Sequence, residues 1–75
     1  MTERMQYDTY RLKAYMEEAD LGPMDLVRVC GIAVSSAYTI NKGKPVNDLD
    51  VLYKVYVGLK AAGHNVTFVQ LTGIE

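Results

Sequence analysis

The sequence predicts a single, mainly α-helical domain of four to five helices, followed by one β-strand over about residues 65–72. Three observations predict this class. Apolar residues recur at helical spacing along most of the chain, Gly and Pro divide it into short segments, and near the end the pattern changes to β-branched and aromatic residues. A chain of 75 residues with 49% apolar and 23% charged content fits one folded domain, 1–75, rather than a disordered tail.

The first helix is expected from an amphipathic pattern that ends before Gly22 and Pro23. Its apolar face recurs at helical spacing: Leu12, Tyr15, Met16 and Ala19. Asp8 precedes this pattern and is the expected N-cap. The segment therefore predicts a helix of roughly three turns.

Two short helices with a tight turn between them are expected next. Pro23 suits the first position of a helix, so the second helix is predicted over Pro23–Cys30, and Gly31 ends it. A third helix is predicted over Val34–Lys42, before Gly43 and Pro45 stop it. Its inward side chains are Ala37 and Ile40. This arrangement over about 23–42 is a helix-turn-helix whose second helix has a polar outer face.

A fourth helix is expected to open at Asn47, with Asp50 in the place of a capping-box acid. One apolar stripe supports it: Leu49, Leu52, Val55, Tyr56 and Leu59. The segment 51–57 is also rich in β-branched and aromatic residues, but the cap and the helical spacing favour a helix.

The β-branched tail reads as one strand over about residues 65–72, and a lone strand needs a partner for its backbone. Residues 1–7 or a second copy of the chain would supply that partner, and the second copy is favoured. The expected dimer interface contains Val66, Phe68, Val69, Leu71 and Val57.

Composition excludes several function classes. One cysteine, Cys30, and one histidine, His64, supply neither a disulfide nor a set of zinc ligands. Cys30 is expected in the core and His64 in solvent past a helix end, so no catalytic residue, metal or cofactor is expected and an enzyme is disfavoured. No apolar stretch suits a membrane span or a signal peptide, and a cytoplasmic protein is expected.

The stretch from Leu12 to Val55 resembles the phage-repressor/Cro (Xre-type) helix-turn-helix DNA-binding family. The matching points are Leu12-Lys13, Leu26-Val27, Gly31-Ile32, Ile40 and Gly43-Lys44-Pro45. The resemblance covers more than half of the chain without a gap, and it implies a four- to five-helix, repressor-like fold. Ala33 stands where the family usually has a Ser or Thr cap on the third helix.

Carried over by position, the resemblance implies two sets of DNA-contacting residues. The residues toward base edges are Val34, Ser35, Ser36, Tyr38 and Thr39. The residues toward phosphates are Pro23, Met24, Arg28, Asn41, Lys42 and Lys44. The base-reading set has no Arg, Asn or Gln for bidentate contacts, so DNA shape or water would contribute to discrimination.

The function that this resemblance implies is sequence-specific regulation of transcription. We expect a small phage or prophage repressor or Cro-like protein, bound as a homodimer in the major groove of a short double-stranded operator, without a small-molecule ligand. It would associate with the nucleoid when bound and act as a repressor or an activator. The alternative is an antitoxin or adaptor whose main partner is another protein. The net charge of −1 has an uneven distribution, because residues 26–47 carry three basic side chains and no acidic one.

Overall fold

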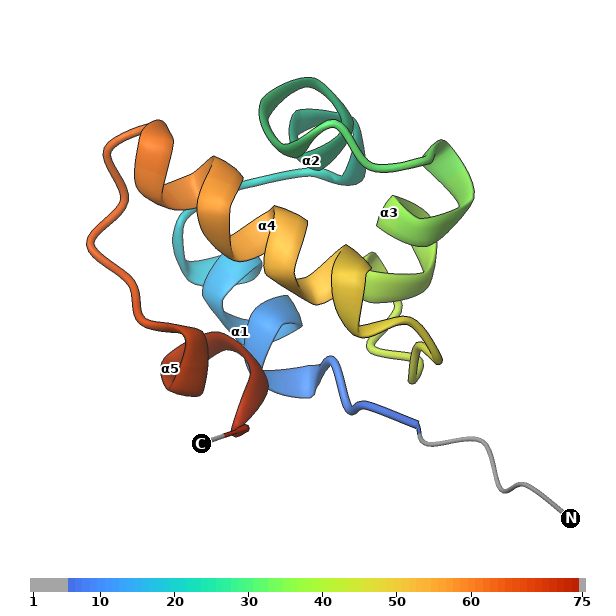
Figure 1. The fold of residues 1–75 in the computed structure, drawn as a ribbon. Helices are drawn as coiled ribbons and strands as arrows, with labels where there is room; N and C mark the ends of the chain where they lie inside the picture. Colours follow the sequence, from blue (N-terminus) through green and yellow to red (C-terminus); the bar gives the residue numbers. More distant parts are fainter. Residues whose placement is uncertain (1–5, 75) are drawn as a thin grey trace, which may run out of the picture.

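A computed structural model gives the fold of the chain and describes residues 6–74. Within that range the protein is all-α (Figure 1). The helices are α1 (Tyr10–Glu18), α2 (Pro23–Cys30), α3 (Val34–Asn41), α4 (Leu49–Ala61) and α5 (Phe68–Thr72). The mainly α class is confirmed, but the C-terminal strand is wrong, since the described residues contain no strand and only a single antiparallel bridge between Tyr7 and Val46.

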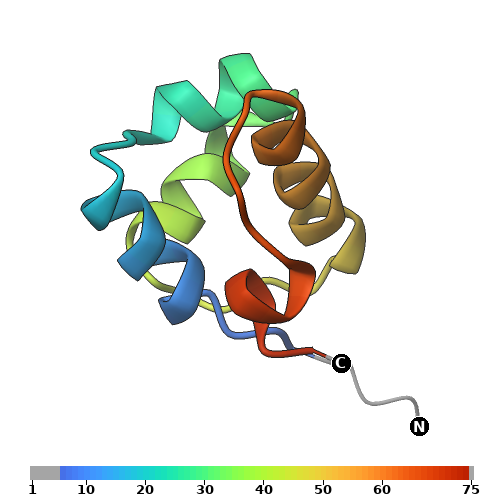
Figure 2. The same ribbon diagram turned by 90° about the vertical axis from the view of Figure 1, so that its left-hand side faces the viewer.

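The helices surround one common core (Figures 1 and 2). Helix α2 packs against α3 and α4, α1 packs against α3 and α5, and α4 also contacts α5. The buried apolar side chains are Leu12, Met16, Leu26, Ile32, Ala37, Ile40, Val46, Leu52, Val55, Leu59, Val66 and Leu71. No helix in residues 6–74 is both long and apolar enough to cross a bilayer.

The turn between α2 and α3 has the geometry that the sequence predicts. Gly31 closes α2 in the left-handed region, with a φ of 70°, and its N–H donates to the carbonyl of Val27 at 3.1 Å. Ile32 is buried beneath the turn. Helix α3 begins at Val34 without a side-chain cap, because Ala33 occupies the cap position, and it ends at Asn41, one residue earlier than expected.

Two predicted N-caps are displaced by one residue. Asp48, not Asn47, caps α4, and its carboxylate accepts a hydrogen bond from the Asp50 N–H at 2.9 Å. Thr9, not Asp8, precedes α1, and no side chain caps that helix. The hydroxyl of Thr9 is buried and donates instead to the Lys44 carbonyl at 2.7 Å, which ties the start of α1 to the loop after α3.

The apolar face of α4 is partly as predicted. Leu52, Val55 and Leu59 are buried, whereas Leu49 in the first turn is exposed and Tyr56 is half-buried. Gly58 lies so close to α2 that a Cβ built on it would stand 2.7 Å from the Cα of Cys30. The two helices therefore touch at a point where only glycine fits.

The C-terminal segment forms a short helix instead of a strand because both of its ends are capped. The Thr67 hydroxyl accepts a hydrogen bond from the Gln70 N–H at 3.0 Å, and Gly73 closes the helix with a φ of 75°. Helix α5 packs on α1 and α4 and buries Leu71 and Thr72. Tertiary packing and the two caps thus prevail over the β propensity of the segment.

Two of the five residues of the predicted dimer interface are buried in the fold of a single chain. Val66 and Leu71 are 1% exposed in the core of the same chain, so neither is free to pair with a second copy. Phe68 is half-buried, and only Val57 and Val69 of the predicted set are exposed. In the alternative pairing of 65–72 with residues 1–7, Tyr7 is paired instead with Val46, and residues 1–5 lie outside the described part of the chain.

Candidate nucleic-acid interface

Helix α3 has one buried face and one uncovered face. Ala37 and Ile40 are fully buried, which fixes the helix against the core. On the opposite side Val34 is 48% exposed and Tyr38 is 43% exposed, and Ser35 is exposed beside them. Three of the five predicted base-reading residues therefore lie on the uncovered face of a helix that packs at the edge of the molecule (Figure 1).

Ser36 and Thr39, the other two predicted base-reading residues, are half-buried. With Ser35 they line a shallow groove of about 330 Å³, which the loop after α3 and Val51 in the first turn of α4 complete. The Thr39 hydroxyl donates to the Ser35 carbonyl at 2.9 Å. Thr39 therefore presents a hydroxyl oxygen with acceptor capacity and a methyl group, while its proton is already used within the helix.

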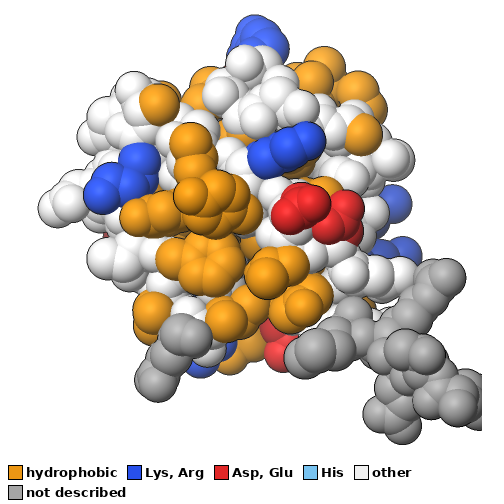
Figure 3. Space-filling model, viewed as in Figure 1, with side chains coloured by type: hydrophobic (Ala, Val, Ile, Leu, Met, Phe, Trp, Pro, Cys, Tyr) orange, Lys and Arg blue, Asp and Glu red, His pale blue; other side chains and the backbone are white. Residues whose placement is uncertain are grey.

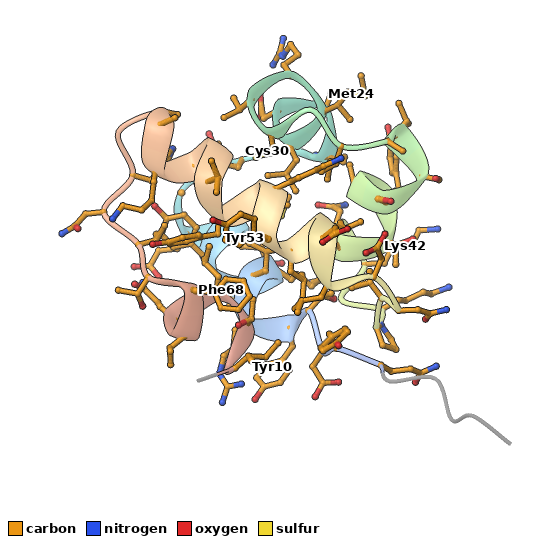
Figure 4. All side chains as sticks on the ribbon, in the orientation of Figure 1. Tyr10, Met24, Cys30, Lys42, Tyr53 and Phe68 are labelled. Carbon is orange, nitrogen blue, oxygen red and sulfur yellow. The ribbon has the colours of Figure 1, made fainter. Side chains whose placement is uncertain are left out.

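The end of α3 carries the basic groups of the candidate interface. Lys42 follows the helix directly (Figure 4), and Lys44 lies in the next loop. Both side chains are exposed. Neither forms an ion pair with another residue in the 6–74 range. Asn41, the last residue of α3, is half-buried. Because Thr9 holds the carbonyl of Lys44, the backbone that presents these charges is anchored to α1.

The start of α2 contains an acid that the sequence reasoning missed. The Asp25 carboxylate accepts a hydrogen bond from the Gly22 N–H at 2.8 Å and forms an ion pair with Arg28. The hydrogen bond from Gly22 and then the Arg28 guanidinium lower the pKa of Asp25. The signal was present in the sequence, because an acid at the third position of a Pro-opened helix is typical of a capping residue.

This acid changes the environment of three predicted phosphate contacts. Pro23 is half-buried, Met24 is exposed, and Arg28 has a side chain that is 72% exposed but already paired with Asp25. The N–H at Gly22, which faces an anion in typical helix N-termini, is bound to the chain's own carboxylate. Lys42 and Lys44 are therefore the basic residues of the predicted set that carry uncompensated charge among the described residues.

A second uncovered surface lies over α4 and α5. Figure 3 shows hydrophobic side chains gathered into one patch on this face. Its exposed members are Tyr53, Val57 and Val69, and the half-buried Tyr56 and Phe68 lie among them. We refer to these five residues as the apolar patch.

His64 and Cys30 differ from the expectations for them. His64 is half-buried, and its Nδ1 forms a 2.6 Å hydrogen bond with the Tyr15 hydroxyl. Cys30 is only half-buried, and burial raises the pKa of its thiol. Within residues 6–74, no group of three His, Cys, Asp or Glu side chains is placed to hold a metal ion.

Comparisons with protein-family models, with curated proteins and with solved structures found no match to this chain.

Proposed function

We propose that the protein is a sequence-specific, DNA-binding regulator of transcription that places α3 in the major groove. The observation that carries this proposal is the position of α3. One side of the helix is anchored by Ala37 and Ile40, the other side is uncovered, and Lys42 lies at its end. A helix of 10–12 Å diameter fits a groove about 12 Å wide, so the uncovered face can reach base edges while Lys42 reaches a phosphate.

The chemistry of the uncovered face defines the expected readout. Ser35 and Ser36 offer hydroxyl groups that donate or accept at several bases, and Val34 offers a methyl surface for thymine. No side chain on this face makes the bidentate contacts that read guanine or adenine directly. Recognition therefore combines moderate direct readout with DNA shape and bridging water.

The resemblance to the phage-repressor/Cro family supports the finer form of this proposal. In that form the protein is a small homodimeric repressor or Cro-like regulator of phage or prophage type. The turn after α2 and the first turns of α3 support it, because Gly31 adopts the left-handed conformation and Ile32 and Ala37 are buried, as two closely crossing helices require.

The alternative function, an antitoxin or adaptor with a protein partner, is favoured by one observation, the apolar patch over α4 and α5. Large exposed apolar patches often mark protein-binding surfaces. An antitoxin can also bind DNA, so the two functions differ in whether the protein selects a DNA sequence by itself.

A selection from random duplex DNA, followed by binding titrations at several salt concentrations, tests the proposal. The protein should enrich a palindromic or directly repeated site. Ser36→Ala and Thr39→Ala should change the preferred sequence. Lys42→Ala should weaken binding to all duplexes alike and lower the slope of log K against log salt by about 1.

Arg11→Gln is the matched control for Lys42→Ala, because it removes one exposed positive charge from α1, away from α3. It should leave the preferred sequence and the salt slope unchanged. A selection that enriches no sequence at moderate salt, together with equal slopes for the wild type and Lys42→Ala, would contradict the proposed function.

A further inference from the structure

The outer face of α4 carries a regular stripe of exposed residues. Asp50, Tyr53, Val57 and Lys60 follow one another at spacings of three, four and three residues, which keeps them on one side of a helix. All four are exposed, and Tyr53 is 57% and Val57 is 45% exposed. The stripe therefore has an acidic end, an apolar middle and a basic end.

Aromatic contacts hold the middle of the stripe in place. The ring centre of Tyr53 lies 6.2 Å from that of Tyr56 and 6.3 Å from that of Phe68 in α5. Figure 4 shows Tyr53 and Phe68 beside each other on this face. The ammonium group of Lys60 lies 5.8 Å from the centre of the Tyr56 ring, so the basic end is also in contact with the apolar patch.

A groove runs beside the stripe. It has a volume of about 360 Å³ and lies between the end of α2 and the C-terminal half of α4. Val29 and Cys30 form one wall, and Tyr53, Lys54, Val57, Gly58 and Ala61 form the other, so its lining is mostly apolar, with Lys54 as its charged member. Gly58 and Ala61 have small or no side chains, which leaves room for a large side chain from outside.

We propose that this face binds the same face of a second copy of the chain, with the two α4 helices antiparallel about a two-fold axis between Tyr53 and Val57. In that register each Asp50 faces the partner's Lys60. Each Tyr53 faces the partner's Val57, beside the groove. A two-fold interface must be complementary to itself, and the acid–apolar–apolar–base order has this property.

The order of charges selects this occupant and this direction. A parallel arrangement would place Asp50 against Asp50 and Lys60 against Lys60, which like-charge repulsion disfavours. In the antiparallel arrangement each Asp50 pairs with the partner's Lys60, so both charged residues of the stripe have a partner within the dimer. It also covers Tyr53 and Val57, which are the most exposed apolar side chains of the stripe.

This inference deepens the proposed function, because it names the partner in the homodimer. It replaces the predicted pairing of residues 65–72 with an interface on α4. Val51 in the first turn of α4 shares a groove with Ser35 and Ser36, so α3 lies at the N-terminal end of α4. The proposed two-fold axis therefore places the two α3 helices at opposite ends of the α4 pair. Dimerisation itself requires no DNA and is tested without it.

Sedimentation equilibrium of the full chain, without DNA, tests the interface. The wild type should dimerise at micromolar concentrations. Val57→Glu should raise the dimer dissociation constant at least about 100-fold, because two carboxylates would be buried against apolar surface. Asp50→Lys and Lys60→Asp should each raise it about 5- to 10-fold. An equimolar mixture of these two variants should recover the wild-type value, because each chain then carries the charges that the other needs.

Glu18→Lys at the end of α1 is the matched control, since it changes the net charge by the same amount as Asp50→Lys but lies outside the stripe. Melting curves of all variants confirm that each is folded. A wild type that stays monomeric at 100 µM, a Val57→Glu dimer of unchanged affinity, or a mixture weaker than its components would overturn the inference. A dimer that meets these expectations but selects no DNA sequence upholds the interface and refutes the proposed function.

Discussion

Gly58→Ala is expected to destabilise the protein, although it places the residue with the highest helix propensity inside α4. The Cβ of the new alanine would lie 2.7 Å from both the Cα and the Sγ of Cys30 and 3.0 Å from its Cβ. An ordinary separation between carbon atoms is about 3.5–4.0 Å, so α2 and α4 must move apart by about 1 Å at this point. Because one of the atoms belongs to the backbone, a change of rotamer cannot relieve the clash.

The size of the effect follows from two opposing terms. The alanine gains about 1 kcal/mol of helix propensity. Overpacking of a close helix crossing costs about 1–3 kcal/mol, and a backbone clash places this case at the upper end. The expected net loss in the free energy of unfolding is about 1–2 kcal/mol, which corresponds to a decrease in melting temperature of about 5–15 °C for a domain of this size.

Thermal and urea unfolding at one fixed protein concentration measures this loss. The double variant Gly58→Ala with Cys30→Ala should recover part of it, because the clash with the sulfur disappears while the clash with the backbone of residue 30 stays. Ala14→Gly, at an exposed position inside α1, measures the propensity term alone. A Gly58→Ala protein that melts above the wild type would show that α2 and α4 do not approach as closely as described.

Two further substitutions and one reactivity measurement test single features of the structure. Tyr15→Phe removes the hydrogen bond to His64 and should lower the free energy of unfolding by about 1 kcal/mol, measured by urea unfolding. Asp25→Asn should reduce stability at pH 7, because the charged carboxylate accepts the Gly22 N–H and pairs with Arg28, and these two contacts lower its pKa. Since that contribution is present above the unfolded-state pKa and is lost as the pH falls through the folded-state value, the melting temperatures of the two proteins should converge in acid. The raised pKa of Cys30 should make its alkylation at pH 8 slower than that of the urea-unfolded chain.

The segment from α2 to α3 could be predicted from the sequence because local rules decide it. Pro23 suits a first helical position and Gly31 adopts the left-handed conformation that ends α2. The alternation of buried and exposed residues then places Ala37 and Ile40 inward without reference to the rest of the chain. Prediction and structure agree here on the bounds of α2 and differ by one residue on the end of α3.

The C-terminal segment shows where composition misleads. Its β-branched residues predict a strand, but a strand requires a partner and the fold offers none in the described residues. The segment also carries a helix signature like those used earlier in the chain. Thr67 and Gln70 have the spacing of a capping box, and Gly73 stands where a helix commonly ends. Intrinsic propensity for a strand is weak and depends on context, so the caps and the burial of Leu71 decide the structure.

The sequence analysis missed two contacts, and they differ in how far the sequence could have revealed them. The ion pair of Asp25 with Arg28 lies within one helix and could have been foreseen from its spacing of three residues. The approach of Gly58 to Cys30 could not, because it depends on how α4 crosses α2. A glycine inside a helix signals only that some packing reason exists.

The charges at the candidate interface connect the two proposals. Arg28 is paired with Asp25, so each copy has Lys42 and Lys44 as uncompensated cations near α3 within residues 6–74. Each phosphate neutralised on double-stranded DNA contributes about 0.9 to the salt slope, so one copy gives a slope of about 2 and two copies a slope of about 4. With a net charge of −1, the chain as a whole does not attract DNA. In the proposed dimer, two linked α3 helices would bind one operator with a shared entropic cost, which would raise affinity beyond that of a single helix. If both proposals hold, the α4 dimer forms without DNA, whereas DNA binding at physiological salt requires the dimer.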